Sequence, residues 1–375
     1  MRIGIVSQSY YPIRGGVAEH VFHTASELER RGHEVTIITA NFSRFDDDHG
    51  RQVIRIGRDV TVPYNGAFVN VTVSFDFQSV IGKIEAERKF DIVHIHGPLE
   101  PLLPLYALRY FTCPKVGTFH SYSTGTPIGY VLLNKALRSM ASRLDARIAV
   151  SDAARGFISR FVPGQYDVIP NGVDIEQFSP NVVPMSWYDP SKEFTILFVG
   201  RLDPRKGLKY LIQAFSIVAQ QLPRARLVVV GNGILRRYYE HFVTPNLRHR
   251  VSFVGFVSTR DLPRYYRSCD VFVSPAVGSE SFGIVLIEAL ASGKAVVASD
   301  IVGYNSVVRN QQDGLLVEKR NPLAIAKAIL EVAQRPDRRS ELERAARKRG
   351  VEFAWSTVTS KIESVYERVI EQKRA

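Results

Sequence analysis

The sequence predicts an α/β protein with two parallel sheets, and three observations support this prediction. Short apolar segments of strand length alternate with segments in which apolar residues recur at helical spacing. The alternation occurs in two series, separated by a stretch rich in Pro, Asn, Asp and Ser. The chain has 375 residues, enough for about two domains that each bury a sizeable core.

The first series opens with a strand–helix–strand unit. Residues 2–7 form a short apolar strand, and 17–31 have the apolar spacing of a helix. Gly32 stands where a helix C-cap belongs, and 34–39 form the next strand. Such a unit implies a parallel sheet with right-handed crossovers. Further strands are expected at residues 92–96, 115–119, 146–150 and 167–169.

The second series starts with a strand at 195–199. Residues 171–192 lack both periods and are predicted to be a linker. We therefore expect an N-terminal Rossmann-like domain at 1–172 and a C-terminal one at 173–355, with the final helix (356–375) packing back on the first. Because ligands bind beyond the carboxyl ends of parallel strands, the two domains are expected to face an interdomain cleft. The later strands are expected at 227–230, 251–253, 271–274 and 295–298.

Composition excludes several classes of protein. The chain is 45% hydrophobic and 23% charged, which excludes disorder, collagen and coiled coil. No apolar run approaches the ~20 residues of a membrane span, and the polar residues near the N-terminus favour a strand over a secretory leader. Cys113 and Cys269 build no disulfide framework and stand in no metal-ligand spacing, so we expect a cytoplasmic protein with no metal site.

The net charge of +12 suggests an anionic partner. Residues 201–268 hold 13 basic against 3 acidic residues, and 101–165 hold 8 against 2. Capture of nucleotide phosphate explains the first stretch and an anionic lipid surface the second, with a solvated basic surface as the alternative for both. Nucleic acid is not expected, since no nucleic-acid motif accompanies the charge.

Two loops at strand ends combine glycine with anion-binding features. In the loop 11–17, Gly15 and Gly16 precede a helix, where backbone and helix dipole can approach an anion; a turn that needs positive φ is the alternative. In the loop 200–207, Arg201 and Lys206 stand beside a helix start, where diphosphate oxygens would lie. A cluster of surface charges is the alternative there.

The segment 278–289 carries two carboxylates with seven residues between them. Ser281 is the predicted helix cap, so Glu280 and Glu288 are expected on roughly one face, about two helical turns apart. Such a pair could hold sugar and ribose hydroxyls while backbone N–H groups hold phosphate. A dipole-complementing acid explains Glu280 but leaves Glu288 unexplained in an apolar helix, where a carboxylate needs a partner.

His120 follows the strand 115–119, where an imidazole could hydrogen-bond a hydroxyl or share a proton. A structural histidine is the alternative. His94 and His96 alternate on one strand face, but no acidic or Cys partner accompanies them, so a metal site is not expected.

With these loops in this order, the sequence resembles the retaining glycosyltransferases of family 4, which have the GT-B fold. The resemblance covers essentially the whole chain, and within the family the sequence is most similar to phosphatidylinositol α-mannosyltransferases. Pro63-Tyr64-Asn65-Gly66 and the run RIAVSDAAR at 147–155 contribute to that similarity. The other matching motifs are GGV near residue 16, HxH at 94–96, TFH at 118–120, IPNGVD at 169–174, GR…KG at 200–207 and E-x7-E at 280–288.

The resemblance implies a role for each loop. Arg201 and Lys206 would neutralise the leaving nucleoside diphosphate, Glu280 would contact the transferred sugar, and Glu288 would hold the ribose hydroxyls. His120 would lie at the transferred sugar near the acceptor. The remaining donor contacts would come from Gly15 and Gly16 (diphosphate and sugar), Val257 (nucleobase, through backbone), and the backbone of Ser281, Phe282, Gly283, Ile284 and Val285 (sugar and phosphate).

The implied activity is retaining, metal-independent transfer of a hexose to a lipid or polyol acceptor at the inner membrane face. The donor is a nucleotide sugar, with GDP-mannose preferred and UDP-sugars kept as an alternative, and no cofactor is permanently bound. The remaining alternatives are a glucosyl- or N-acetylglucosaminyltransferase, a sugar-nucleotide epimerase, and a basic module that binds membrane or nucleic acid. The sequence indicates no oligomeric state.

The predicted membrane surface departs from that of the lipid-modifying relatives. Those relatives carry a basic amphipathic helix, whereas the matching stretch 75–90 here has three basic residues offset by three acidic ones. Attraction of about 1 kcal/mol per surface cation would then be small. The basic stretch 101–165 is the expected substitute, with Lys135, Arg138, Arg143 and Arg147.

Overall fold

In the computed structural model of the protein, the chain divides into two compact units. Unit 1 comprises Met1–Asn171 and Trp355–Ala375, and unit 2 comprises Gly172–Ala354. The structure describes residues 1–13, 15–41, 50–64, 67–73, 76–123, 125 and 128–374, with only the backbone at 59–64, 67–73 and 128. Arg14, Asn65, Gly66 and Phe75, which belong to segments singled out above, lie outside the described residues.

Unit 1 is built around a parallel sheet of seven strands in the order β3-β2-β1-β6-β7-β8-β9. A separate antiparallel hairpin pairs β4 with β5. The strands are β1 (Arg2–Val6), β2 (Glu34–Ala40), β3 (Gln52–Ile56), β4 (Arg58–Tyr64), β5 (Ala67–Val73), β6 (Ile92–His96), β7 (Lys115–Phe119), β8 (Ala146–Ala149) and β9 (Asp167–Val168). The helices are α1 (Gly16–Arg30), α2 (Phe77–Arg88), α3 (Leu103–Tyr110), α4 (Ile128–Leu132), α5 (Asn134–Ala141), α6 (Asp152–Ile158) and α14 (Trp355–Arg374).

Unit 2 has a second parallel sheet, of six strands in the order β12-β11-β10-β13-β14-β15. Its strands are β10 (Phe194–Val199), β11 (Ala225–Val230), β12 (Val251–Gly255), β13 (Val271–Ser274), β14 (Ala295–Ser299) and β15 (Leu315–Val317). Its helices are η1 (Pro204–Lys206), α7 (Leu208–Gln221), α8 (Arg236–Phe242), η2 (Pro245–Arg250), α9 (Leu262–Arg267), α10 (Ile284–Ala291), α11 (Val302–Asn305), α12 (Pro322–Gln334) and α13 (Pro336–Val351).

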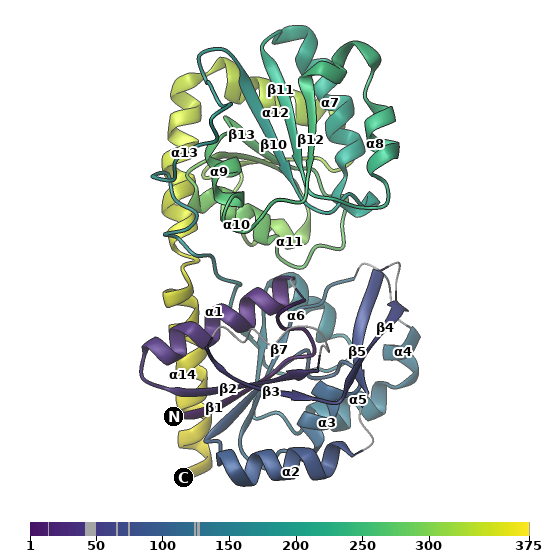
Figure 1. The fold of residues 1–375 in the computed structure, drawn as a ribbon, viewed down its shortest axis with the longest axis vertical. Coiled ribbons are helices and arrows are strands. Elements are labelled where there is room, and N and C mark those ends of the chain that lie inside the picture. Colours follow the sequence, from purple (N-terminus) through teal and green to yellow (C-terminus); the bar gives the residue numbers. More distant parts are fainter. Residues whose placement is uncertain are drawn as a thin grey trace. The chain divides into compact units, whose positions relative to one another are not determined.

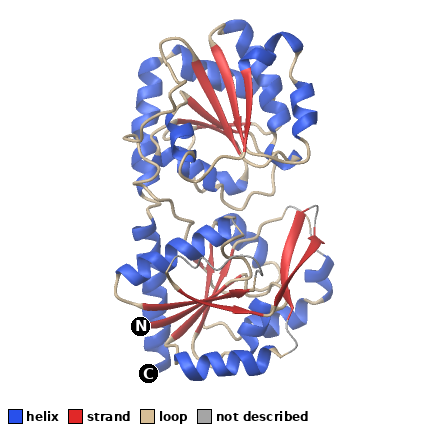
Figure 2. Cartoon of the chain, in the orientation of Figure 1, coloured by secondary structure: helices blue, strands red, loops and turns tan. Residues whose placement is uncertain are grey.

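Each sheet separates two hydrophobic clusters, because helices cover both of its faces (Figure 2). Every residue of β6 and of β14 is buried, as expected for central strands of covered parallel sheets. This confirms the predicted α/β class with two parallel sheets. Nearly continuous apolar runs predicted the inner strands, and the edge strands β9 and β12 were also predicted. The edge strands β3 and β15 and the hairpin strands β4 and β5 were not predicted.

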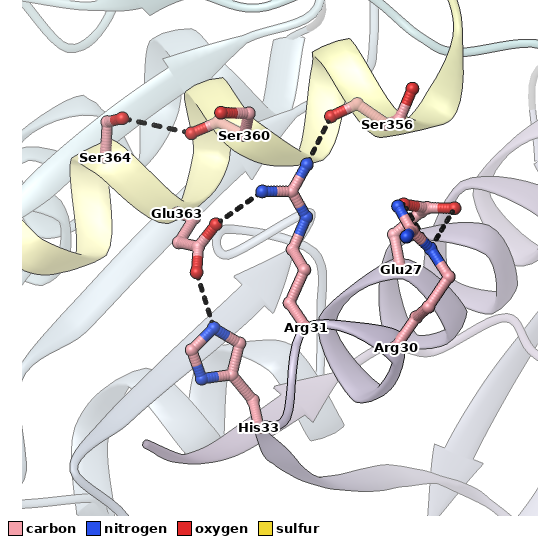
Figure 3. A network of polar contacts seen from close by, with 8 residues as sticks. All are labelled: Glu27, Arg30, Arg31, His33, Ser356, Ser360, Glu363 and Ser364. Atoms are coloured by element: carbon pink, nitrogen blue, oxygen red, sulfur yellow. Dashed lines mark hydrogen bonds and ion pairs between the residues drawn. The ribbon is translucent and has the colours of Figure 1, made fainter.

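The C-terminal helix α14 belongs to unit 1, where it lies beside α1 (Figure 1). Its apolar face is buried, with Val358, Ile362 and Val365 at most 3% exposed. Polar contacts also join α14 to the residues that follow α1 (Figure 3). Arg31 Nη1 lies 2.9 Å from one Glu363 carboxylate oxygen, and His33 Nε2 lies 2.6 Å from the other. The last helix is thus part of unit 1, although 183 residues of unit 2 precede it.

The stretch predicted as a linker is packed against unit 2. Val173 and Phe178 are buried in the core of that unit, and the Val173 N–H donates to the Phe353 carbonyl at 2.8 Å. The sequence predicted irregular structure here but not this packing, because scattered apolar residues in irregular backbone give no periodic signal. The boundary between the units falls at Asn171 and Gly172.

Candidate active site

The loop after β10 brings two cations to the carboxyl edge of the unit 2 sheet. The Asp203 carboxylate caps η1 by accepting the Arg205 N–H at 2.9 Å, so Lys206 lies on a short helical turn. Gly207 follows in a left-handed conformation with φ 70°, and a Cβ there would lie 1.9 Å from the Pro275 carbonyl oxygen. Glycine is therefore required for this loop to pack closely against the loop that follows β13.

Lys206 and Glu280 meet at this edge. Lys206 Nζ lies 2.8 Å from Glu280 Oε1, and the two side chains are 19% and 15% exposed. An ammonium has three donors and a carboxylate about four acceptor positions, so each partner keeps further hydrogen-bonding capacity for a ligand. The pair can thus offer a cation and an anion to one ligand.

Arg201, the other predicted cation of this loop, has a different partner. Its Nη2 is 3.4 Å from Asp203 Oδ2, and the side chain is 63% exposed. The same carboxylate oxygen lies 3.3 Å from Arg205 Nη2. An exposed ion pair of this kind contributes little to stability, so the Arg201 guanidinium can exchange Asp203 for another anion at small cost.

The conformation of the segment 278–283 differs from the one predicted. Helix α10 begins at Ile284, its N-cap is Gly283 in a left-handed conformation, and no side chain caps it. The prediction of Ser281 as the cap was therefore wrong. Glu280 lies in the loop before the helix and Glu288 within it, as expected for a pair that runs from the loop into the helix.

Close backbone packing shapes this loop. A Cβ on Gly303 would lie 1.9 Å from the Glu280 carbonyl oxygen, and one on Gly283 would lie 2.6 Å from the Tyr304 ring. Ser279 has a positive φ of 58°, a conformation that costs energy outside glycine. Tyr304 is fully buried, and its hydroxyl lies 2.7 Å from Ser274 Oγ. The loop is thus held against α11, and the first N–H groups of α10 point out of the helix start without intrahelical acceptors.

Glu288 has a buried partner, as its place in an apolar helix requires. The Tyr266 hydroxyl donates to Glu288 Oε2 at 2.7 Å. Burial, together with the neighbouring carboxylate, raises the pKa of Tyr266 well above its usual value, so the phenol stays protonated and donates. Val257, at the expected nucleobase position, packs partly buried against the same core after β12.

In unit 1 the paired glycines lie at the start of α1. Gly15 is the N-cap with an extended φ of 174°, and Gly16 is the first helical residue. The alternative of a positive-φ turn is therefore wrong for Gly15. The space around its missing Cβ is open, with no atom within 4 Å among the residues that the structure describes. The backbone here is exposed at a helix N-terminus, an arrangement that suits an anion.

Four histidines gather near the carboxyl ends of β6 and β7. His94 and His96 share one face of β6 with ring centroids 4.4 Å apart. His120 stacks on His96 at 5.2 Å, and His20 of α1 lies edge-on to both His96 and His120 at 5.2 Å. Burial lowers the pKa of His20 to about 4 and that of His94 to about 3, and it holds those of His96 and His120 well below 6.5. The cluster is therefore neutral at pH 7.

Specific hydrogen bonds orient these rings. His96 Nδ1 lies 2.9 Å from His120 Nε2, and His20 Nδ1 lies 2.9 Å from Asn171 Oδ1. His94 contacts the Tyr366 hydroxyl and Thr118 Oγ1, each at 2.6 Å. No group of three or more metal-ligating side chains occurs within the described part of the chain. The cluster can offer hydrogen bonds but no charge.

Several of these residues were missed from the sequence. His20 lies three positions after Val17 on the buried face of α1, so its place in the helical period was the available signal. Tyr366 and Tyr304 lie on the buried faces of their helices, so the sequence pattern marked them only as core residues. Glu100 is also new: it lies in the loop after β6, and burial raises its pKa to about 7.

Comparison with known proteins matches this architecture. Residues 14–177 match the model described as Glycosyltransferase Family 4, and residues 186–349 match Glycosyl transferases group 1. The chain is 34% identical over 375 residues to the phosphatidyl-myo-inositol mannosyltransferase of Mycobacterium tuberculosis, covering 98% of this chain and 97% of that protein. An uncharacterised glycosyltransferase of Methanocaldococcus jannaschii is 30% identical over 394 residues, covering 99% of both chains.

Solved structures agree on the fold. A sucrose-phosphate synthase from Thermosynechococcus elongatus superposes with a TM-score of 0.79 at 24% identity, covering 99% of both chains. HepE of Anabaena, solved with UDP and glucose, superposes with a TM-score of 0.76 at 20% identity, covering 98% of this chain and 99% of that one. Fold and family models together define a GT-B glycosyltransferase. The chain belongs to glycosyltransferase family 4.

Proposed function

We propose that this glycosyltransferase moves a mannosyl residue from GDP-mannose to a phosphatidylinositol-type glycolipid, with retention of anomeric configuration. The observation that carries the proposal is the Lys206–Glu280 pair at the carboxyl edge of the unit 2 sheet. It offers a cation for a diphosphate beside a carboxylate for sugar hydroxyls. The names of the relatives that are 34% identical support mannose as the sugar and an inositol lipid as the acceptor.

In the proposed reaction, an acceptor hydroxyl oxygen bonds to C1 of the sugar while the bond from C1 to the diphosphate oxygen breaks. Attack occurs on the face from which the diphosphate departs, and the hydroxyl proton passes to a departing phosphate oxygen. Negative charge therefore grows on the diphosphate. Lys206 and Arg201 stabilise that charge, and the helix N-termini at Gly16 and at Ile284 supply further N–H donors.

The proposal assigns the remaining contacts to the other candidate site residues. Glu280 accepts from sugar hydroxyls while Lys206 holds its other oxygen. Glu288, oriented by Tyr266, accepts from the ribose hydroxyls. Val257 places its backbone at the nucleobase, and His120 contacts the transferred sugar. In this proposal the nucleotide is assigned to unit 2, and contacts with the sugar and the acceptor are assigned to unit 1. The backbone donors proposed for sugar and phosphate are those of Gly15, Ser281, Phe282, Gly283 and Val285.

A glycolipid acceptor requires access to a membrane, and one surface of unit 1 suits this. Among the described residues, no helix is long and apolar enough to cross a bilayer. Three consecutive apolar residues at the end of α4 are exposed: Val131 by 53%, Leu132 by 77% and Leu133 by 57%. Such a run costs free energy in water, and burying it in a lipid interface recovers about 25 cal/mol per Å².

The charges beside this apolar turn indicate an anionic membrane. Lys135, Arg138 and Arg143 are exposed on or just after α5. The two guanidinium groups donate to the Phe161 and Arg109 carbonyls, which leaves their charge uncompensated by those contacts. Asp145, the nearest acid in sequence, already pairs with Lys373 at 2.9 Å. Apolar side chains in the interface with cations at the headgroups would hold unit 1 on the inner face of the membrane.

Binding and transfer of labelled donors test the proposal. Thermal melting in GDP, UDP and their common sugar conjugates identifies the base, because selective binding raises the melting temperature by mass action. We expect GDP and GDP-mannose to stabilise the protein, and labelled mannose to pass to phosphatidylinositol in vesicles. UDP-sugars are the second candidate donor, because a solved structural neighbour has bound UDP. Stabilisation by UDP-sugars alone would leave the family assignment unchanged and would make a UDP-sugar the donor in place of GDP-mannose. No stabilisation by any of these nucleotides would overturn the donor site.

A further inference from the structure

The hydrogen bond between His96 and His120 determines which nitrogen of His120 is protonated. Both rings are neutral near pH 7 because burial lowers their pKa values. A neutral imidazole has one N–H donor and one bare nitrogen. Across the 2.9 Å contact between His96 Nδ1 and His120 Nε2, one nitrogen must therefore donate and the other accept.

The surroundings of His96 decide the direction. His96 is 1% exposed, and its Nε2 has no protein hydrogen-bond partner among the described residues. If His120 donated, the single proton of His96 would sit on that Nε2, and a buried N–H would lack an acceptor. If His96 donates from Nδ1, Nε2 holds only a lone pair. Buried N–H groups without an acceptor are rarer than under-satisfied acceptors, which favours donation by His96.

We propose that His96 is a positioning residue that holds His120 as its Nδ1–H tautomer. Of the four clustered rings, His120 is the one that is partly exposed, and with Nε2 engaged by His96 it presents Nδ1 to a ligand. His120 then donates a hydrogen bond to a substrate hydroxyl oxygen and has no lone pair there to take a proton. This role rests on the proposed function, in which the departing phosphate receives the acceptor's proton. The tautomer itself does not rest on it.

Nitrogen NMR of histidine-labelled protein tests the tautomer directly. The His120 resonances are assigned by their loss in His120→Asn, and one-bond and two-bond couplings then show which nitrogen is protonated. We expect the Nδ1–H form in the wild type. We expect His96→Leu to lose that preference, and His96→Asn to keep it, because the asparagine amide nitrogen can replace Nδ1 as the donor. An Nε2–H form in the wild type would overturn the proposal.

His94→Leu is the matched control. His94 shares the strand, the face and the burial of His96, but its hydrogen bonds go to Tyr366 and Thr118. We expect its loss to leave the His120 tautomer unchanged, and the same change as in His96→Leu would contradict the assignment. In the transfer assay, His96→Leu should lower kcat about tenfold with donor KM nearly constant, and His96→Asn should restore most of it. An inactive wild type would refute the proposed function and leave the tautomer measurement standing.

Discussion

The carboxyl edges of the two sheets are built from opposite kinds of chemistry. In unit 2 the edge carries charge: Lys206 pairs with Glu280, and Arg201 lies near Asp203. In unit 1 the edge carries four imidazoles whose pKa values burial lowers, so that none is charged at pH 7. Both edges belong to parallel sheets of the same class.

This difference teaches what each edge can bind. A diphosphate that gains charge as it leaves needs fixed cations, and paired charges hold those cations in place. A hydroxyl-rich sugar or inositol needs neutral donors and acceptors whose directions are set. Two parallel sheets of one class can therefore carry different binding chemistry, because the side chains at their strand ends differ.

The largest effect is expected at the charged edge. Lys206→Ala should lower kcat/KM about 10²–10³-fold, since it removes a cation from the departing diphosphate. Lys209→Ala is the matched control: Lys209 is exposed on α7, where it lies over the Phe242 ring. Steady-state transfer by both variants measures the difference. Equal activity of the two variants would show that the Lys206 ammonium does not stabilise the departing diphosphate.

The neutral edge should respond to acid instead. Protonating a buried imidazole is unfavourable in the folded state. Each ring therefore lowers the free energy of unfolding of the protein as the pH falls from about 6.5 towards the lowered pKa of that ring. For His94, whose pKa is lowered to about 3, the loss between pH 6.5 and 4.5 is about 2 kcal/mol. Glu100, with its pKa raised to about 7, acts in the opposite direction over the same range.

A matched pair of proteins isolates this effect. Urea unfolding of the wild type and of His94→Leu at pH 7, 5.5 and 4.5 gives the destabilisation caused by the substitution at each pH. We expect that destabilisation to shrink by roughly 2.5 kcal/mol from pH 7 to pH 4.5, because only the wild type has a buried imidazole that resists protonation. A constant difference would mean that His94 takes up its proton in the folded state as easily as in the unfolded one.

A smaller effect is expected for the ribose contact. Glu288→Gln keeps an acceptor for the Tyr266 hydroxyl but removes the charge. Donor KM should rise about tenfold with kcat nearly unchanged, since the ribose is bound equally in the ground and transition states. Tyr266→Phe, which leaves the carboxylate intact, should raise KM less. A fall in kcat at constant KM would place Glu288 at the reacting atoms instead.

The smallest effect concerns the membrane surface at α4 and α5. Leu132→Ser should weaken binding to phosphatidylserine-containing vesicles roughly fivefold, and Lys135→Glu should weaken it further at low salt. Lys83→Glu on α2 is the control, because the outward face of that helix mixes basic and acidic residues. Sedimentation with vesicles measures all three variants. An effect of Lys83→Glu as large as that of Leu132→Ser would contradict the assignment of the membrane surface to α4 and α5.

The sequence predicted the charged edge better than the neutral one. Arg201, Lys206 and Glu280 stand in short motifs at strand ends, and such motifs are visible without coordinates. The pairing of Lys206 with Glu280 was not visible, because it depends on how two loops 74 residues apart pack.

Of the neutral edge, His94, His96 and His120 were singled out from the sequence, but the residues that join them from other elements were not, for a physical reason. His20 and Tyr366 reach the cluster from α1 and α14, and only tertiary packing brings those helices to β6. The helix cap was wrong for a similar reason: Ser281 fits the composition of a cap, but Gly283 takes the left-handed conformation that the packing against Tyr304 requires.

Titration of GDP alone tests the division between the two edges most directly. Calorimetry on the wild type, Lys206→Ala and His120→Asn separates nucleotide binding from contacts to the sugar. The account predicts that Lys206→Ala weakens GDP binding at least about tenfold, while His120→Asn changes it less than about twofold. Loss of GDP binding in the histidine variant with full binding in the lysine variant would contradict it.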